Sequence, residues 1–205
     1  MINGLSPAHQ KQLKKNSRWR VNDNLAGNRD FCPTIIKTAP LTQAASLDVA
    51  QLLANLTDEF GEDLLMRSSV WLTLRESKAS FKIEGEAKHT SRIARFADVI
   101  AHQTGKGDLL INEDALRLLQ KAILGDSMVI TQYGLRQSPV FVGQTHRFQE
   151  ILHYIAPPHL MLTNKLAGLQ AFWEKTIGQS SVMRATVLAF GFIYIHLTLV
   201  IICEQ

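Results

Sequence analysis

The chain has 205 residues, of which 46% are hydrophobic and 20% charged, and its formal net charge is +4. This composition excludes an intrinsically disordered chain and fits a globular protein with one good core. The two cysteines, Cys32 and Cys203, lie far apart and form no metal-ligand pattern. Since cysteines are few and the N-terminus lacks the apolar stretch of a secretory signal, we expect a cytoplasmic protein.

Residues 1–40 form a polar, basic segment that we expect to be irregular. The first thirty residues contain six lysines and arginines but only two aspartates. Such a cluster can touch nucleic acid, but no zinc-ligand spacing accompanies the charges, so a solvated N-terminus is favoured. We therefore do not favour nucleic acid as a partner.

Helical patterns dominate residues 41–125, the expected N-terminal helical region. Residues 41–56 carry a helical apolar stripe. A second helix is predicted from about residue 62 onward, reaching about residue 86. Residues 88–105 form a third predicted helix, and residues 113–124 a fourth, with Asn112 as N-cap and Gly125 as stop. The side chains expected to be buried in the second helix are Leu65, Trp71, Leu72 and Leu74.

The pattern changes within residues 126–205. Residues 129–143 contain helix breakers followed by a β-branched and aromatic run, which predicts a short hairpin or an extended flap. A helix with apolar positions 162, 166, 169 and 173 follows a double proline, and a terminal helix is predicted over about 181–203. Strand content is otherwise low, so the predicted class is mainly α.

Three motifs in this order carry chemical information, and the first is Ser80-Phe81-Lys82-Ile83-Glu84-Gly85. Ser80 and Glu84 lie four residues apart and therefore on one face of a helix. Gly85 ends that helix and leaves the Glu84 carboxylate near its C-terminus. Taken alone, the pattern is typical of a solvent-facing glutamate before a terminal glycine.

The second motif begins with Tyr133, Gly134 and Arg136 and continues with Val140-Phe141-Val142-Gly143. A double proline, Pro157-Pro158, lies downstream. An extended segment exposes unpaired backbone groups and can capture another chain by strand addition. An ordinary hairpin that covers the core is the alternative interpretation.

The third motif is His196, which follows Phe192-Ile193-Tyr194-Ile195 on the apolar terminal helix. A histidine on an apolar face is more often a hydrogen-bonded core residue than a catalyst. The order and spacing of the three motifs nevertheless resemble the Fic family of protein adenylyltransferases over about residues 60–196. In that family an inhibitory motif, S/T-x-x-x-E-G/N, precedes a flap, a double proline and the helix of the catalytic histidine.

The resemblance implies a mainly α, Fic-like helical domain with a short β-hairpin flap. Intact relatives use ATP and Mg²⁺ to transfer AMP to hydroxyl side chains of target proteins. By resemblance, His196 is the general base that takes the hydroxyl proton. The inhibitory motif would act through Glu84, which pairs with an arginine that otherwise binds the ATP γ-phosphate. By resemblance, the inhibitory residues are Ser80, Glu84 and Gly85. The residues of the flap that would dock the target protein are Val140, Phe141, Val142 and Gly143.

The chain departs from the family directly after His196. Family members continue as HPFxDGNGR, a loop and helix start that hold the ATP phosphates, whereas this chain continues as LTLVIICEQ. AMP transfer needs backbone donors and positive charge around those phosphates. We therefore expect a Fic core that is incomplete at its C-terminus, as after a frameshift, with no productive binding of ATP or Mg²⁺ and no catalytic activity.

Two other functions stay open at this point. The apolar run 185–203 is long enough for a tail anchor in a membrane, although His196 lies within it and only Arg184 flanks it. A non-catalytic interaction module that uses the flap or the basic N-terminus is the other alternative. We expect no metal site, because His146 and His153 lack carboxylate partners. The target protein is unknown, and homo-oligomerisation is left open.

Overall fold

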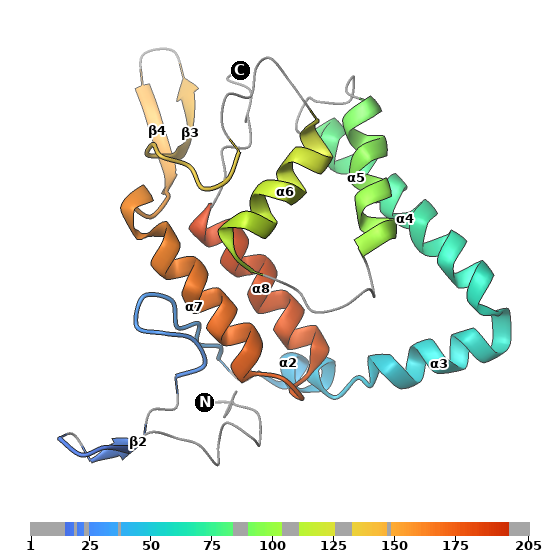
Figure 1. Ribbon diagram of the computed structural model, residues 1–205, viewed down its shortest axis with the longest axis horizontal. Helices are drawn as coiled ribbons and strands as arrows, with labels where there is room; N and C mark the ends of the chain where they lie inside the picture. The colour runs from blue at the N-terminus through green and yellow to red at the C-terminus, as the bar shows by residue number, and fades with distance from the viewer. Residues whose placement is uncertain are drawn as a thin grey trace. The chain divides into compact units, whose positions relative to one another are not determined.

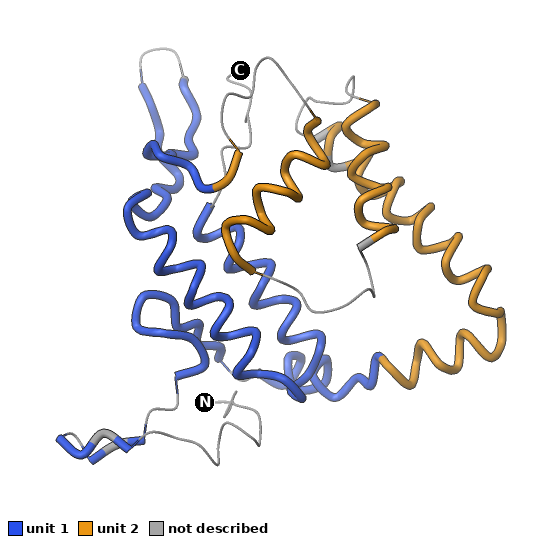
Figure 2. The backbone as a smooth tube through the Cα atoms, in the orientation of Figure 1, with its two compact units in different colours: residues 1–49, 135–197 blue, residues 50–134, 198–205 orange. Residues whose placement is uncertain are grey.

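The computed structural model describes residues 15–18, 20–22, 25–36, 38–83, 90–103, 111–125, 133–146 and 149–196. Over these residues the chain is mainly α-helical with two short antiparallel strand pairs, which confirms the predicted class. It divides into two compact units, residues 1–49 with 135–197 and residues 50–134 with 198–205 (Figure 2). This division differs from the predicted one, because the N-terminal segment belongs to the same unit as the C-terminal helices.

Unit 1 is built on two helices, α7 (Leu162–Lys175) and α8 (Ser181–Ile195), which pack against each other (Figure 1). The predicted apolar face of α7 is confirmed at positions 162, 166 and 169, which are buried. Gly191 allows the close approach of α8, because a Cβ at that position would lie 2.6 Å from Leu169 Cδ1. The remaining core side chains of these two helices are Phe172, Val187, Leu188 and Ile195.

The other elements of unit 1 are short. They are β1 (Lys15–Asn16), β2 (Val21–Asn22), α2 (Ala39–Ala45), β3 (Phe141–His146), β4 (Gln149–Ile155) and the 3-10 helix η1 (His159–Met161). Helix α2 packs on α8, and β3 pairs with β4 as an antiparallel hairpin. The predicted flap is therefore a hairpin, but it lies further along the chain than residues 129–143. Residues 129–132 lie outside the described part.

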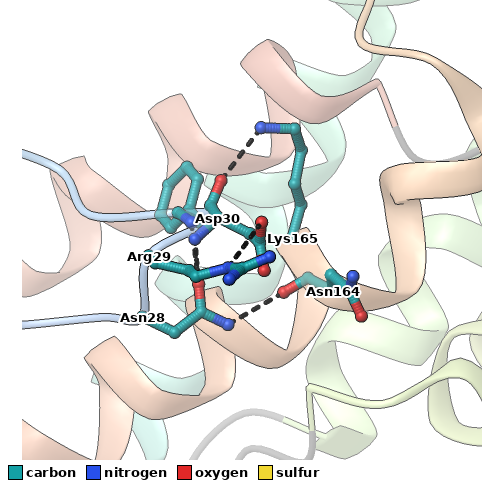
Figure 3. Close-up of polar contacts among 6 residues, drawn as sticks. Asn28, Arg29, Asp30, Asn164 and Lys165 are labelled. Atoms are coloured by element: carbon teal, nitrogen blue, oxygen red, sulfur yellow. Dashed lines mark hydrogen bonds and ion pairs between the residues drawn. The ribbon is translucent and has the colours of Figure 1, made fainter.

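Residues 25–36 run across α7 and α8 without regular structure, and they are anchored there. Asn28 Nδ2 donates to the Asn164 carbonyl at 3.0 Å, and Lys165 Nζ donates to the Asp30 carbonyl at 2.9 Å (Figure 3). Phe31 is only 5% exposed. A Cβ at Gly168 would lie 2.7 Å from Phe31 Cβ, so the segment approaches the α7 backbone closely. The predicted irregular structure is confirmed here. The basic side chains that the structure describes in the N-terminal segment, Lys15, Arg18, Arg20 and Arg29, are exposed as predicted, whereas the backbone around Phe31 is anchored on the helices.

Helix α8 begins at Ser181, as predicted, and Ser180 caps it by accepting from the Met183 amide. It ends at Ile195, eight residues before the predicted end at 203, because His196 has a left-handed backbone. Residues 197–203 of the apolar run lie outside the described residues. Within the described part of the chain, no helix is long and apolar enough to cross a membrane.

Unit 2 contains α3 (Val49–Phe60), α4 (Glu62–Ile83), α5 (Thr90–Gln103) and α6 (Glu113–Leu124). The predicted helix 41–56 is thus two helices, α2 and α3, separated by residues 46–48. Helix α6 has the predicted bounds and caps: the Ala115 amide donates to Asn112 Oδ1 at 2.8 Å, and Gly125 follows the last turn with φ 69°. Helix α4 covers most of the predicted inhibitory helix 62–86.

Burial in unit 2 is shallow. Trp71 and Leu72 are 58% and 49% exposed, so their predicted burial is wrong. Ile93 and Ala97 of α5 and Ser77 of α4 are buried where these two helices pack. Beside them lies an apolar hollow of about 530 Å³, lined by Leu72, Thr73, Glu76, Ser77, Phe81, Phe96 and Ile100.

Candidate functional site

His196 caps the C-terminal end of α8 in a left-handed conformation, with φ 48° and ψ 60°. Its amide donates to the Phe192 carbonyl at 3.0 Å and closes the last turn. Glycine is the residue usually found in this conformation at a helix end, because a Cβ is disfavoured there. A non-glycine residue held in this way is a reason to look for a functional role.

Arg136 binds the backbone at this helix end. It is 3% exposed, and its Nε donates to the His196 carbonyl at 2.7 Å. Its other nitrogens donate to the carbonyls of Ser138, at 2.7 Å, and Pro157. Ser138 precedes β3 and Pro157 follows β4, so one guanidinium connects both ends of the hairpin with the end of α8. Sequence reasoning included Arg136 in a motif but gave it no role.

Tyr154 makes a second connection between the hairpin and α8. Its hydroxyl donates to the Tyr194 carbonyl, two residues before His196, and the two rings lie 6.4 Å apart between centroids. The Tyr194 ring also contacts Phe31, at 6.5 Å, and Lys165 Nζ lies 5.5 Å from its centroid. The structure therefore brings together two of the three predicted motifs, His196 and the hairpin.

The predicted docking residues lie on β3 or directly before it. Phe141 and Val142 are 54% and 36% exposed, and Val140 accepts from the Ala156 amide at 3.0 Å. The pairing register shifts between Val142 and Gly143. A Cβ at Gly143 would lie 2.5 Å from the Ile151 carbonyl oxygen, which explains a glycine there. Within the described residues, β3 pairs with β4 alone, so its other edge is unpaired.

The electrostatics of the site favour a neutral imidazole. Burial, and to a lesser degree the Arg136 guanidinium, lowers the pKa of His196 below the ordinary value of a histidine. Burial likewise raises the pKa of the Tyr154 hydroxyl. A neutral imidazole is the form that accepts a proton, as a general base must. The position predicted for the base therefore has a suitable protonation state near neutral pH.

The predicted inhibitory motif falls only partly within the described residues. Ser80 is on α4, in unit 2, and Glu84 and Gly85 lie outside the described residues. Its inhibitory role accordingly stays a prediction. Across the described residues, no group of three or more His, Cys, Asp or Glu side chains is arranged to hold a metal ion.

Comparison of the chain with protein-family models, with curated proteins and with solved structures gave no match.

Sequence reasoning missed two parts of this site. The strand β4 has a recognisable signal, since Ile151, Tyr154 and Ile155 are β-branched or aromatic and a proline pair follows. The anchoring of Phe31 near Tyr194 has no local signal, because its partners on α7 and α8 are more than 130 residues away in the sequence.

Proposed function

We propose that this chain is a Fic-type protein in which His196 occupies the place of the catalytic base but which does not itself transfer AMP. The observation that supports this most is the left-handed His196 at the end of an apolar helix, joined through Arg136 to a hairpin. A base at a helix end that is connected to the ends of a hairpin suits transfer to a side chain of a bound peptide, since one edge of β3 pairs with no strand that the structure describes.

The residues after His196 argue against activity. In the family motif the next eight positions are P-F-x-D-G-N-G-R, and here positions 197–204 read L-T-L-V-I-I-C-E. Val200 stands where the motif has the aspartate for Mg²⁺, and Glu204 stands where it has an arginine. Donors and positive charge around the phosphates usually contribute the largest part of such catalysis. Glu204 would instead bring a negative charge toward the ATP phosphates.

The inhibitory role of Ser80, Glu84 and Gly85 belongs to the same proposal. Glu84 would block nucleotide binding only if the arginine of the catalytic motif were present. Position 204, where the quoted motif has an arginine, is Glu204, so this position supplies no such partner for Glu84.

A second candidate function is a non-catalytic interaction module that uses the hairpin. Several large apolar side chains of β3 and β4 are more than one-third exposed, and these are Phe141, Val142, Ile151, Leu152 and Ile155. An apolar strand with an unpaired edge is a template for strand addition by another chain. In this alternative the docking function of the flap persists without transfer of a nucleotide.

The direct test is incubation of the purified chain with Mg·ATP labelled on the α-phosphate, alone and with a cell extract. We predict no labelled protein, because the phosphate-binding loop is absent from positions 197–204. His196→Ala is the matched control. Labelling that His196→Ala abolishes would contradict the proposed inactivity, and would show that phosphates are held by other residues.

A further inference from the structure

Arg136 carries a buried charge, and all the hydrogen bonds described for its guanidinium go to backbone carbonyls. A guanidinium has five donors and keeps its charge at ordinary pH. Burying such a charge is costly unless it is well hydrogen-bonded. Its described hydrogen-bond partners are the carbonyls of Ser138, Pro157, Ile195 and His196, with no carboxylate among them. The described contacts of this guanidinium are thus hydrogen bonds to these four carbonyls, with no described ion pair beside them.

The carbonyls come from three segments that meet at one point. Two of them end α8, where the unpaired carbonyls of the last turn and the helix dipole favour a cation. The other two stand before β3 and after β4. A planar guanidinium fixes directions as well as distances, which an ammonium on a flexible stem does not.

We propose that Arg136 is a positioning residue for His196, which holds the left-handed backbone of that histidine in a fixed relation to both ends of the β3–β4 hairpin. The inference rests on the proposed function only in taking His196 as the base. A base must be held within hydrogen-bond reach of the hydroxyl proton that it removes. Arg136 would provide this by fixing the histidine relative to the hairpin predicted to present that hydroxyl.

The charge of Arg136 acts on the imidazole as well. It adds to burial in lowering the pKa of His196. Among the described residues, Tyr154 donates to the Tyr194 carbonyl and Lys165 Nζ lies 5.5 Å from the Tyr194 ring centroid, while Asp30 accepts from Lys165 through its backbone carbonyl. None of Tyr154, Tyr194 and Lys165 supplies the negative charge that would keep a proton on the imidazole. Positioning and charge are thus two separable effects of one side chain.

Nuclear magnetic resonance of the full chain separates these effects. The titration of the His196 imidazole, assigned with His196→Gln, reports the charge, and hydrogen exchange of the His196 amide reports the positioning. In Arg136→Gln we expect the pKa of His196 to rise toward the ordinary histidine value and its amide to exchange roughly tenfold faster or more. Arg136→Lys keeps the positive charge but loses the planar set of N–H donors. In this variant we expect the His196 amide to exchange faster and the pKa of His196 to rise less than in Arg136→Gln.

Arg184→Gln is the matched control. Arg184 also donates from Nε and a terminal nitrogen, to Thr176 Oγ1 at 3.1 Å and the Trp173 carbonyl at 2.8 Å, but at the start of α8. We expect it to leave the titration and exchange of His196 unchanged. Equal changes in this control, or an unchanged His196 in both Arg136 variants, would overturn the proposal.

One measurement needs no substitution at Arg136. In the unsubstituted chain, the Arg136 Nε proton should exchange slowly with solvent, and its resonance should follow the titration of His196. A rapidly exchanging Nε proton, or one that does not respond to that titration, would overturn the proposal even if the Arg136 variants failed to fold. None of these readouts depends on AMP transfer, so a failed inference is distinguishable from a failed proposed function.

Discussion

A left-handed backbone costs a residue with a Cβ roughly 1–2 kcal/mol, and His196 bears that cost at the end of α8. Phe192 and Arg136 hold the conformation by hydrogen bonds to the His196 amide and carbonyl. Strain of this kind persists where the surroundings fix it, and it is concentrated at functional sites. The conformation of His196 therefore supports a functional role for this residue, and the role of base is our proposal from the family resemblance.

This strain predicts an unusual order of stabilities. His196→Gly should be more stable than His196→Ala by about 1 kcal/mol, because only glycine adopts the left-handed backbone without cost. Chemical denaturation of the two variants measures the difference. At Ala189, an exposed position within α8, Ala189→Gly should instead lose about 0.5–1 kcal/mol. If the glycine variant is less stable than the alanine variant at position 196 as well as at position 189, His196 is not left-handed in solution.

The lowered pKa of His196 predicts how stability changes with pH. The folded chain binds the proton of this histidine less readily than the unfolded chain does, so protonation favours unfolding. The stabilising contribution of a neutral His196 is present above about pH 6.5, the ordinary histidine value, and is lost as the pH falls through the folded pKa.

Thermal unfolding between about pH 7.5 and pH 5 measures this contribution. The melting temperature should fall less steeply toward low pH in His196→Gln than in the unsubstituted chain. A slope that is unchanged in His196→Gln would contradict the electrostatic account.

Among the elements, the N-terminal segment 25–36 is tied to α7 by hydrogen bonds and to α8 by the Phe31 ring. Besides Asn28 and Lys165, Lys175 Nζ donates to the Gly27 carbonyl at 2.8 Å. Phe31 places its ring against Gly191, where a Cβ would lie 3.0 Å from Phe31 Cζ. Because Phe31 also contacts Tyr194, this segment supports the part of α8 that precedes His196.

The burial of Phe31 predicts a large loss of stability on truncation. Phe31→Ala should reduce the free energy of unfolding by about 3–5 kcal/mol, the usual effect of emptying a buried phenylalanine site. Phe141→Ala, at a phenylalanine that is 54% exposed, should cost about 1 kcal/mol or less. Urea denaturation of both variants tests this, and equal small losses would show that residues 25–36 are not docked in solution.

Elements with strong local signals could be predicted from the sequence. Helix α6 has an N-cap asparagine, a stop glycine and an apolar stripe, and its bounds agree with the prediction. The division between α2 and α3 was not predicted, because apolar spacing continues through residues 46–48. Ser46 ends α2 there, and its hydroxyl donates to the Gln43 carbonyl at 2.7 Å. Serine competes with helix hydrogen bonding in this way, and this is the signal that periodicity overlooks.

Burial and long-range contacts were harder to predict. An apolar stripe indicates which side chains share a helix face, but it does not indicate whether another element covers that face. Trp71 and Leu72 are on such a stripe and remain exposed. At the candidate site, sequence reasoning identified His196 and the flap residues, whereas the contacts of Arg136 and Phe31 depend on segments far away in the chain.

For the whole molecule, the proposed site and the proposed inhibitor are in different units. His196, Arg136 and the hairpin belong to unit 1, and Ser80 belongs to unit 2. Because we propose that this chain does not transfer AMP, inhibition by Glu84 can be measured only in an active version of the protein. Such a version needs the phosphate-binding residues that positions 197–204 lack.

The most direct measurement is AMP transfer by a chain in which residues 197–204 are replaced by the sequence PFADGNGR. We predict that this chain labels protein with the α-phosphate of Mg·ATP when it also carries Glu84→Gly, and much less when Glu84 is retained. His196→Ala should abolish the labelling, and the unreplaced chain should show none with or without Glu84→Gly. Labelling that persists in His196→Ala, or no labelling by a folded replaced chain with Glu84→Gly, would contradict the assignment of His196 as the base of a Fic-type site.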